Sequence, residues 1–79
     1  MTDAEIAARL TEALVEAADK SAGAATDLVS ANITVTKRAE IAAIETTLDR
    51  QTRTMLFLTA DARDAHGEHI AAASSVHKI

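Results

Sequence analysis

The apolar residues of this chain change their spacing once, at Gly23, and this change sets the order of its secondary structure. Before Gly23, apolar residues recur at intervals of three and four, as on one face of a helix: Ile6, Leu10, Ala13, Leu14 and Ala17. After Gly23 the chain is rich in Ile, Val and Thr, whose branched side chains fit a pleated sheet better than a helix. The sequence therefore predicts one helix followed by strands.

The expected helix has signals at both ends. Thr2 and Glu5 have the spacing of a capping box, in which each side chain satisfies a free amide of the first turn. Glycine accepts the left-handed conformation that ends many helices, so Gly23 is a suitable stop. We expect a helix over residues 3 to 22.

Four later segments have the composition or the period-two alternation of strands: Leu28–Thr36, Glu40–Arg50, Thr54–Arg63 and His69–His77. In the first, we expect Val29, Ala31, Ile33 and Val35 to face the core. The polar stretch Arg50–Arg53 and the turn Asp64–Glu68, with Gly67, give hairpin connections. These elements predict an α+β fold, in which one N-terminal helix packs on a four-stranded antiparallel sheet.

A helical interpretation competes with this one after Gly23. A stripe of apolar residues there approximates helical spacing: Ile41, Ile44, Leu48 and Met55. Against it stands a cluster of threonines, which lose side-chain freedom in helices: Thr46, Thr47, Thr52, Thr54 and Thr59.

The size of the chain predicts a single domain over residues 1–79 that associates with itself. A chain of 79 residues buries a small core and usually needs a disulfide, a metal or a partner subunit. Cysteine is absent, which excludes disulfides and thiolate metal sites, and Phe57 is the only aromatic residue. We therefore expect a homo-oligomer.

The charge and hydropathy of the chain limit its partners. A net charge of -4 and a pI near 5.2 argue against nucleic acid, whose phosphates need a basic surface. No apolar run reaches the roughly 20 residues that span a bilayer, and the first residues do not resemble a signal peptide. The chain is expected to be cytoplasmic, with no membrane partner.

The segment Ile41–Ala73 resembles the C-terminal half of hotdog-fold thioesterases of the phenylacetate-pathway type. The resemblance lies in the basic hairpin Arg50–Arg53, in the pair Arg63 and Asp64, and in the Ile-Ala-Ala-Ala strand after the Gly67 turn. Upstream, the segment 32–35 is similar to the strand that follows the central helix of that fold. The helix itself corresponds to residues 3–22.

This resemblance implies an acyl-CoA thioester as ligand and no cofactor. The acidic position of the family, a general base or nucleophile, falls on Glu12, and backbone amides at the helix start would polarise the thioester carbonyl. Family members also dimerise through the edge strand after the helix, which here implies a homodimer through Leu28–Thr36. Strand-end cations would meet the phosphates of coenzyme A: Lys37, Arg38, Arg50 and Arg53.

The chain also departs from the family. At the helix start, where the family has a His-Gly-Gly type of turn, this chain has Asp3, Ala4 and Glu5. A strand that precedes the helix in most members has no counterpart here, so one wall of the usual acyl pocket is missing. Two other functions therefore stay open: a non-catalytic dimer that binds an acyl or aromatic ligand, and a structural assembly module.

The candidate residues also have simpler interpretations. Glu12 lies in a charged helix stripe that water alone can solvate, and strand-end cations often serve only solubility and protection of sheet edges. The histidines predict no metal site, because no clustered carboxylates accompany them. His69 and His77 are too far apart on one strand, at about 3.3 Å per residue, to share an ion.

Overall fold

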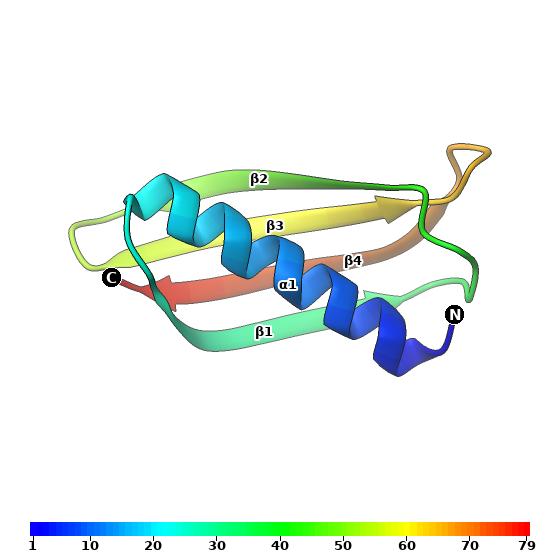
Figure 1. The fold of residues 1–79 in the computed structure, drawn as a ribbon, viewed down its shortest axis with the longest axis horizontal. Coiled ribbons are helices and arrows are strands. Elements are labelled where there is room, and N and C mark those ends of the chain that lie inside the picture. The colour runs from blue at the N-terminus through cyan, green and yellow to red at the C-terminus, as the bar shows by residue number, and fades with distance from the viewer.

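Five elements follow one another along residues 1–79, all of which the computed structural model describes (Figure 1). They are the helix α1 (Asp3–Ala22) and the strands β1 (Asp27–Val35), β2 (Ala43–Gln51), β3 (Met55–Arg63) and β4 (His69–Lys78). The helix lies along one face of the sheet, and the molecule measures 38 × 20 × 16 Å. The predicted α+β class is confirmed, and the helical interpretation of the later segments is wrong.

The helix begins and ends at the predicted capping residues. Thr2 Oγ1 accepts a hydrogen bond from the Glu5 amide, and Glu5 Oε1 accepts one from the Thr2 amide, both at 3.2 Å. At the other end, Gly23 is left-handed with a φ of 72°, and its amide donates to the carbonyl of Asp19 at 2.9 Å. Both ends therefore satisfy backbone groups that would otherwise be free.

The sheet has the order β1-β4-β3-β2, and all neighbouring strands are antiparallel. The strands β2, β3 and β4 follow one another as hairpins, whereas β1 and β2 form the two edges. The connection over residues 36–42 therefore crosses the end of the sheet from one edge to the other (Figure 1). Each edge strand contains a bulge, between Leu28 and Ser30 in β1 and between Leu48 and Arg50 in β2.

The core lies between the helix and the two central strands. Buried residues alternate along β3 in the predicted period of two: Leu56, Leu58, Ala60 and Ala62. One stripe of the helix packs against them: Ile6, Leu10, Leu14 and Ala18. Five of the eleven core residues are alanine, so the core is thin, as the composition predicts.

The edge strands differ in part from expectation. The strand β2 starts at Ala43 rather than Glu40, because the preceding residues span the end of the sheet. In β1, Ile33 and Val35 are half-buried, as predicted, but Ala31 is exposed and Val29 is 56% exposed. The bulge interrupts the alternation beside Val29, and the helix covers the central strands more fully than the edges.

Candidate functional site

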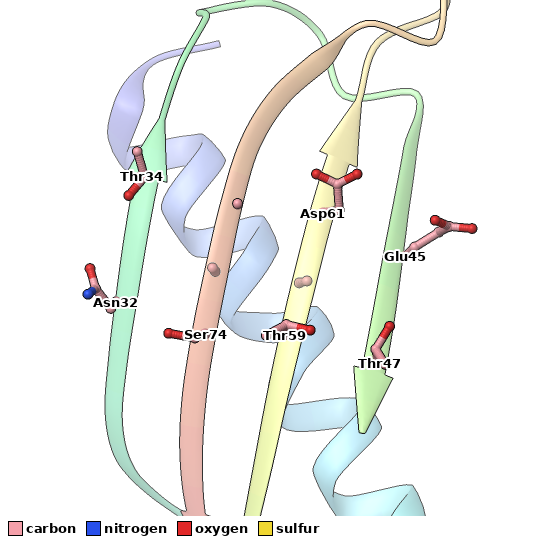
Figure 2. A pocket seen from close by; sticks show the side chains of 10 residues that line it. Asn32, Thr34, Glu45, Thr47, Thr59, Asp61 and Ser74 are labelled. Atoms are coloured by element: carbon pink, nitrogen blue, oxygen red, sulfur yellow. The ribbon is translucent and has the colours of Figure 1, made fainter. Parts of the chain in front are cut away.

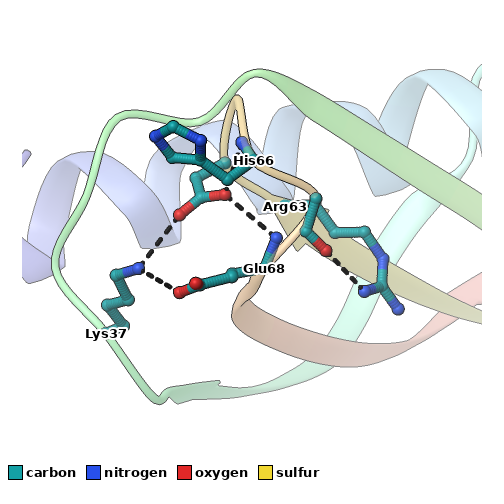
Figure 3. A network of polar contacts seen from close by, with 6 residues as sticks. Lys37, Arg63, His66 and Glu68 are labelled. Carbon is teal, nitrogen blue, oxygen red and sulfur yellow. Dashed lines mark hydrogen bonds and ion pairs between the residues drawn. The ribbon is translucent and has the colours of Figure 1, made fainter.

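Two of the four predicted cationic residues lie just after β1 and already have carboxylate partners. Lys37 Nζ lies 2.7 Å from Glu68 Oε2 and 3.0 Å from Asp64 Oδ2 (Figure 3). Both hydrogen bonds raise the pKa of Lys37, and the one to Glu68 has the larger effect. Arg38 pairs with both carboxylate oxygens of Asp3, at 2.8 and 3.1 Å. Both cations are therefore largely neutralised.

The other two cations lie near the opposite end of the sheet, Arg50 at the end of β2 and Arg53 in the connection from β2 to β3 (Figure 1). The guanidinium carbon of Arg50 is 5.8 Å from the centroid of the Phe57 ring, a cation–π distance. Neither Arg50 nor Arg53 forms an ion pair. The fold thus separates the four predicted cations into two pairs and does not bring them into one site.

Glu12 lies in the middle of α1 on the exposed side of the helix. A shallow depression of about 450 Å³ is lined by Glu12, Thr11, Val15 and Glu16. The Glu12 carboxylate forms no ion pair and no hydrogen bond with another side chain. It is accessible to water or to a ligand, but no neighbouring group fixes its orientation.

The helix start lies away from Glu12 within one chain. The amides of Asp3 and Ala4 have no acceptor within the helix, as expected for a first turn. Eight residues separate Ala4 from Glu12, which corresponds to about 12 Å along a helix. One thioester group cannot contact both the Glu12 carboxylate and these amides of the same chain.

A polar hollow of about 390 Å³ lies on the sheet face opposite the helix (Figure 2). One row of register partners crosses all four strands there, as Asn32, Ser74, Thr59 and Thr47. Next to this row, Glu45 pairs in register with Asp61, whose carboxylate binds Arg63 at 2.9 Å and His69 at 2.6 Å. Sequence reasoning did not select these residues as a site, although the alternation of each strand places them on the face away from the core.

A second hollow, of about 520 Å³, lies between α1 and the edge strand β2. Its lining combines two alanines and two charged residues of the helix with two residues of β2: Ala13, Ala17, Glu16, Lys20, Ile44 and Thr46. We call it the α1–β2 groove.

Two polar residues are buried beneath the helix. Ser75 and His77 are 3% and 0% exposed, and Ser75 Oγ lies 2.7 Å from His77 Nε2. Burial lowers the pKa of His77, while the negative charge of Asp19 acts in the opposite direction. Sequence reasoning missed this pair, although both residues fall in phase with Ala71 and Ala73, the buried positions of the same strand.

The single helix against a four-stranded antiparallel sheet is a hotdog-like fold. It superposes on the X-ray structure of a protein from the thioesterase superfamily with a TM-score of 0.69 and 13% sequence identity. The match covers 82% of this chain and 51% of that one, so this chain spans about half the length of its structural neighbour. No protein-family model and no curated protein matches the sequence.

The described structure also bears on membrane insertion. Its single helix is not apolar enough over a sufficient length to cross a membrane.

Proposed function

We propose that this protein hydrolyses an acyl-CoA thioester, with Glu12 as the general base. The observation that carries the proposal is the likeness of the fold to a thioesterase-superfamily structure. The resemblance of the sequence to hotdog thioesterases supports Glu12 as the acidic residue. The exposed position of Glu12 beside a depression also supports Glu12 as the general base, because a general base must reach a water molecule near the substrate.

The proposed reaction consumes one water molecule. Glu12 takes a proton from water while the water oxygen attacks the carbonyl carbon of the thioester. The carbon–sulfur bond then breaks, the carbonyl forms again, and the departing thiolate takes up the proton that Glu12 accepted, which restores the carboxylate. The products are a carboxylic acid and the free thiol of coenzyme A.

The negative charge that develops on the carbonyl oxygen needs hydrogen-bond donors. Within one chain the helix-start amides are about 12 Å or more from Glu12 along the helix, so we infer that a second copy supplies them. A homodimer through the edge Leu28–Thr36 would bring two copies together. The exposed side chains of Leu28 (43%) and Val29 (56%) support association at this edge.

For the coenzyme A phosphates, Arg50 and Arg53 are better suited than Lys37 and Arg38, whose charges are already paired. The connection that carries Arg53 lies near the C-terminal end of α1 (Figure 1). Ten residues separate Glu12 from Ala22, which is about 15 Å of helix. The long flexible arm of coenzyme A suits such a separation between thioester and phosphates.

A non-catalytic function is the second candidate, and one observation favours it. No side chain hydrogen-bonds to Glu12 or orients it, whereas catalytic bases are usually held in position. In this case the protein would bind an acyl or aromatic ligand without turnover, or would serve as an assembly module.

The test is hydrolysis of short, long and aromatic acyl-CoA thioesters by the wild type, Glu12→Gln and Glu45→Gln. Glu45 is a matched control because it is an exposed glutamate on the sheet face away from the helix, outside the depression beside Glu12. We expect Glu12→Gln to lower kcat by roughly 100-fold or more and Glu45→Gln to change it by less than about threefold. Equal effects of the two substitutions would reject Glu12 as the base, and no turnover by folded protein would favour the non-catalytic function.

The proposed dimer has a separate test. Light scattering at micromolar concentration should give the mass of two chains. A monomer would contradict both the dimer and the two-copy site.

A further inference from the structure

The edge strand β2 has an unpaired side that faces a groove. It pairs with β3 on one side and with no strand on the other. None of its nine residues is fully buried, and only Ile44 is half-buried, whereas the central strands β3 and β4 each have several buried residues. An unpaired strand of this length offers backbone donors and acceptors to another extended chain.

Apolar surface accompanies this edge on the side of the helix. Ala13 and Ala17 are one helical turn apart and leave the α1–β2 groove open beside Ile44. Leu48 is 40% exposed, and it lies on the same side because its register partner Leu58 is buried under the helix. A strand added at this edge would place every second side chain over this apolar surface.

We propose that the β2 edge binds an extended segment of another polypeptide as a fifth strand of the sheet. The backbone of the segment would pair with β2, and its alternate apolar side chains would fill the α1–β2 groove and cover Leu48. This inference concerns a binding surface and does not depend on thioester hydrolysis.

The charges beside the edge define the other side chains of the segment. On the face away from the helix, Glu45 is opposite Asp61, which already binds Arg63 and His69, and Glu45 itself has no cationic partner. Asp49 lies further along β2 on that face, in a hollow that Phe57 also lines, and the neighbouring Arg50 is placed against the Phe57 ring. The two acids, Glu45 and Asp49, outnumber this one cation. Opposite charges on neighbouring strands stabilise a sheet and like charges destabilise it, so the segment should alternate apolar with basic residues.

The same charges disfavour a second copy as the occupant. If two β2 strands paired antiparallel along their full length, Glu45 would face Asp49 of the other copy in both halves of the contact. The exposed β1 edge carries no acid between Leu28 and Val35, so it is better suited to self-association.

The test uses a nine-residue peptide of alternating lysine and valine with blocked ends, titrated into isotopically labelled protein and followed by NMR and amide hydrogen exchange. We expect slower exchange at amides of β2 and unchanged exchange at β1. The matched variants are Leu48→Asn and Leu28→Asn, since the two leucines are 40% and 43% exposed on opposite edges of the sheet. Leu48→Asn should weaken binding by about tenfold, and Leu28→Asn should change it little.

A second peptide with glutamate in place of lysine tests the charge argument, and it should bind more weakly by at least about tenfold. Protection of β1, or a larger effect of Leu28→Asn, would overturn the assignment to β2. Absence of protection with either peptide would overturn the proposal. It would also fail if the β2 amides became protected on raising the protein concentration alone, because a second copy would then occupy the edge.

Discussion

The hydroxyl oxygen of Ser75 and the Nε2 atom of His77 lie 2.7 Å apart and share a hydrogen bond in the layer between helix and sheet. The other ring nitrogen, Nδ1, is also buried and has no hydrogen-bond partner. Protonation of the ring would therefore place a charge in a site from which water is excluded, with only the Asp19 carboxylate in opposition.

This burial predicts that the protein loses stability as the pH falls below about 6.5. The pKa of His77 is lowered in the folded state, so as the pH falls the unfolded chain binds the proton at a higher pH than the folded protein does. Acidification therefore lowers the free energy of the unfolded chain relative to that of the folded protein. The contribution is fully present above the ordinary histidine pKa and decreases toward the lower pKa of the folded state. Urea unfolding of the wild type and His77→Gln should show a steeper fall for the wild type between about pH 7.5 and 5.5; equal slopes would contradict the prediction.

Leu14→Ala should destabilise the protein by about 2–5 kcal/mol, because Leu14 is completely buried where the helix meets the sheet. Leu28→Ala is the control, since that side chain is 43% exposed, and it should have an effect of less than about 1 kcal/mol. Denaturant midpoints measure both changes. Similar losses in the two variants would mean that the helix does not pack on the sheet as described.

The turn between β3 and β4 should depend on Asp64 much more than on Lys37. Asp64 Oδ1 accepts hydrogen bonds from the amides of His66 and Glu68, both at 2.9 Å, and its side chain is only 8% exposed (Figure 3). Asp64→Ala would leave two amides without an acceptor and should lower the free energy of unfolding by about 1–3 kcal/mol. Lys37→Ala removes two ion pairs of a side chain that is 43% exposed and should lower it by less than about 1 kcal/mol. The reverse order in urea unfolding would show that the ion pairs, not the turn, are dominant.

Gly67 lies in the same turn with a φ of 78°, and open space surrounds the position where a side chain would begin. Gly67→Ala should therefore destabilise the protein by about 1–2 kcal/mol through backbone strain alone. Gly67→Asn should be less damaging, because asparagine tolerates the left-handed conformation better. Thermal unfolding of the two variants gives the comparison, and an alanine variant as stable as the wild type would contradict it.

The parts of the fold that sequence reasoning could predict have local causes. The capping box at Thr2 and Glu5, the stop at Gly23 and the alternation along β3 each depend on residues close together in the chain. The exposure of Val29 has a different origin, because it depends on the bulge in β1 and on the limited cover that the helix gives to the sheet edges. Those properties arise only when the elements pack.

The candidate site was less predictable for the same reason. The sequence pattern predicts that Lys37 binds a phosphate, but the fold places this side chain beside Glu68, which is 31 residues further along the chain. Its partner follows from the register of β1 with β4, which the pattern of neither strand specifies alone. The Ser75–His77 pair, by contrast, could have been found, because polar residues at two successive core positions of one strand indicate a hydrogen bond between them.

The position of β1 at the far edge from β2 has a consequence for how the chain reaches this structure. The strands β2, β3 and β4 meet through short connections, whereas β1 pairs with residues of β4 that follow it by 36 to 51 positions, as in Val35 with Ala71 and Asp27 with Lys78. Closing such long loops is slow compared with forming hairpins. We therefore expect the three-stranded meander to form early and β1 to join last, so that during synthesis the sheet cannot be completed on the β1 side until β4 has been made.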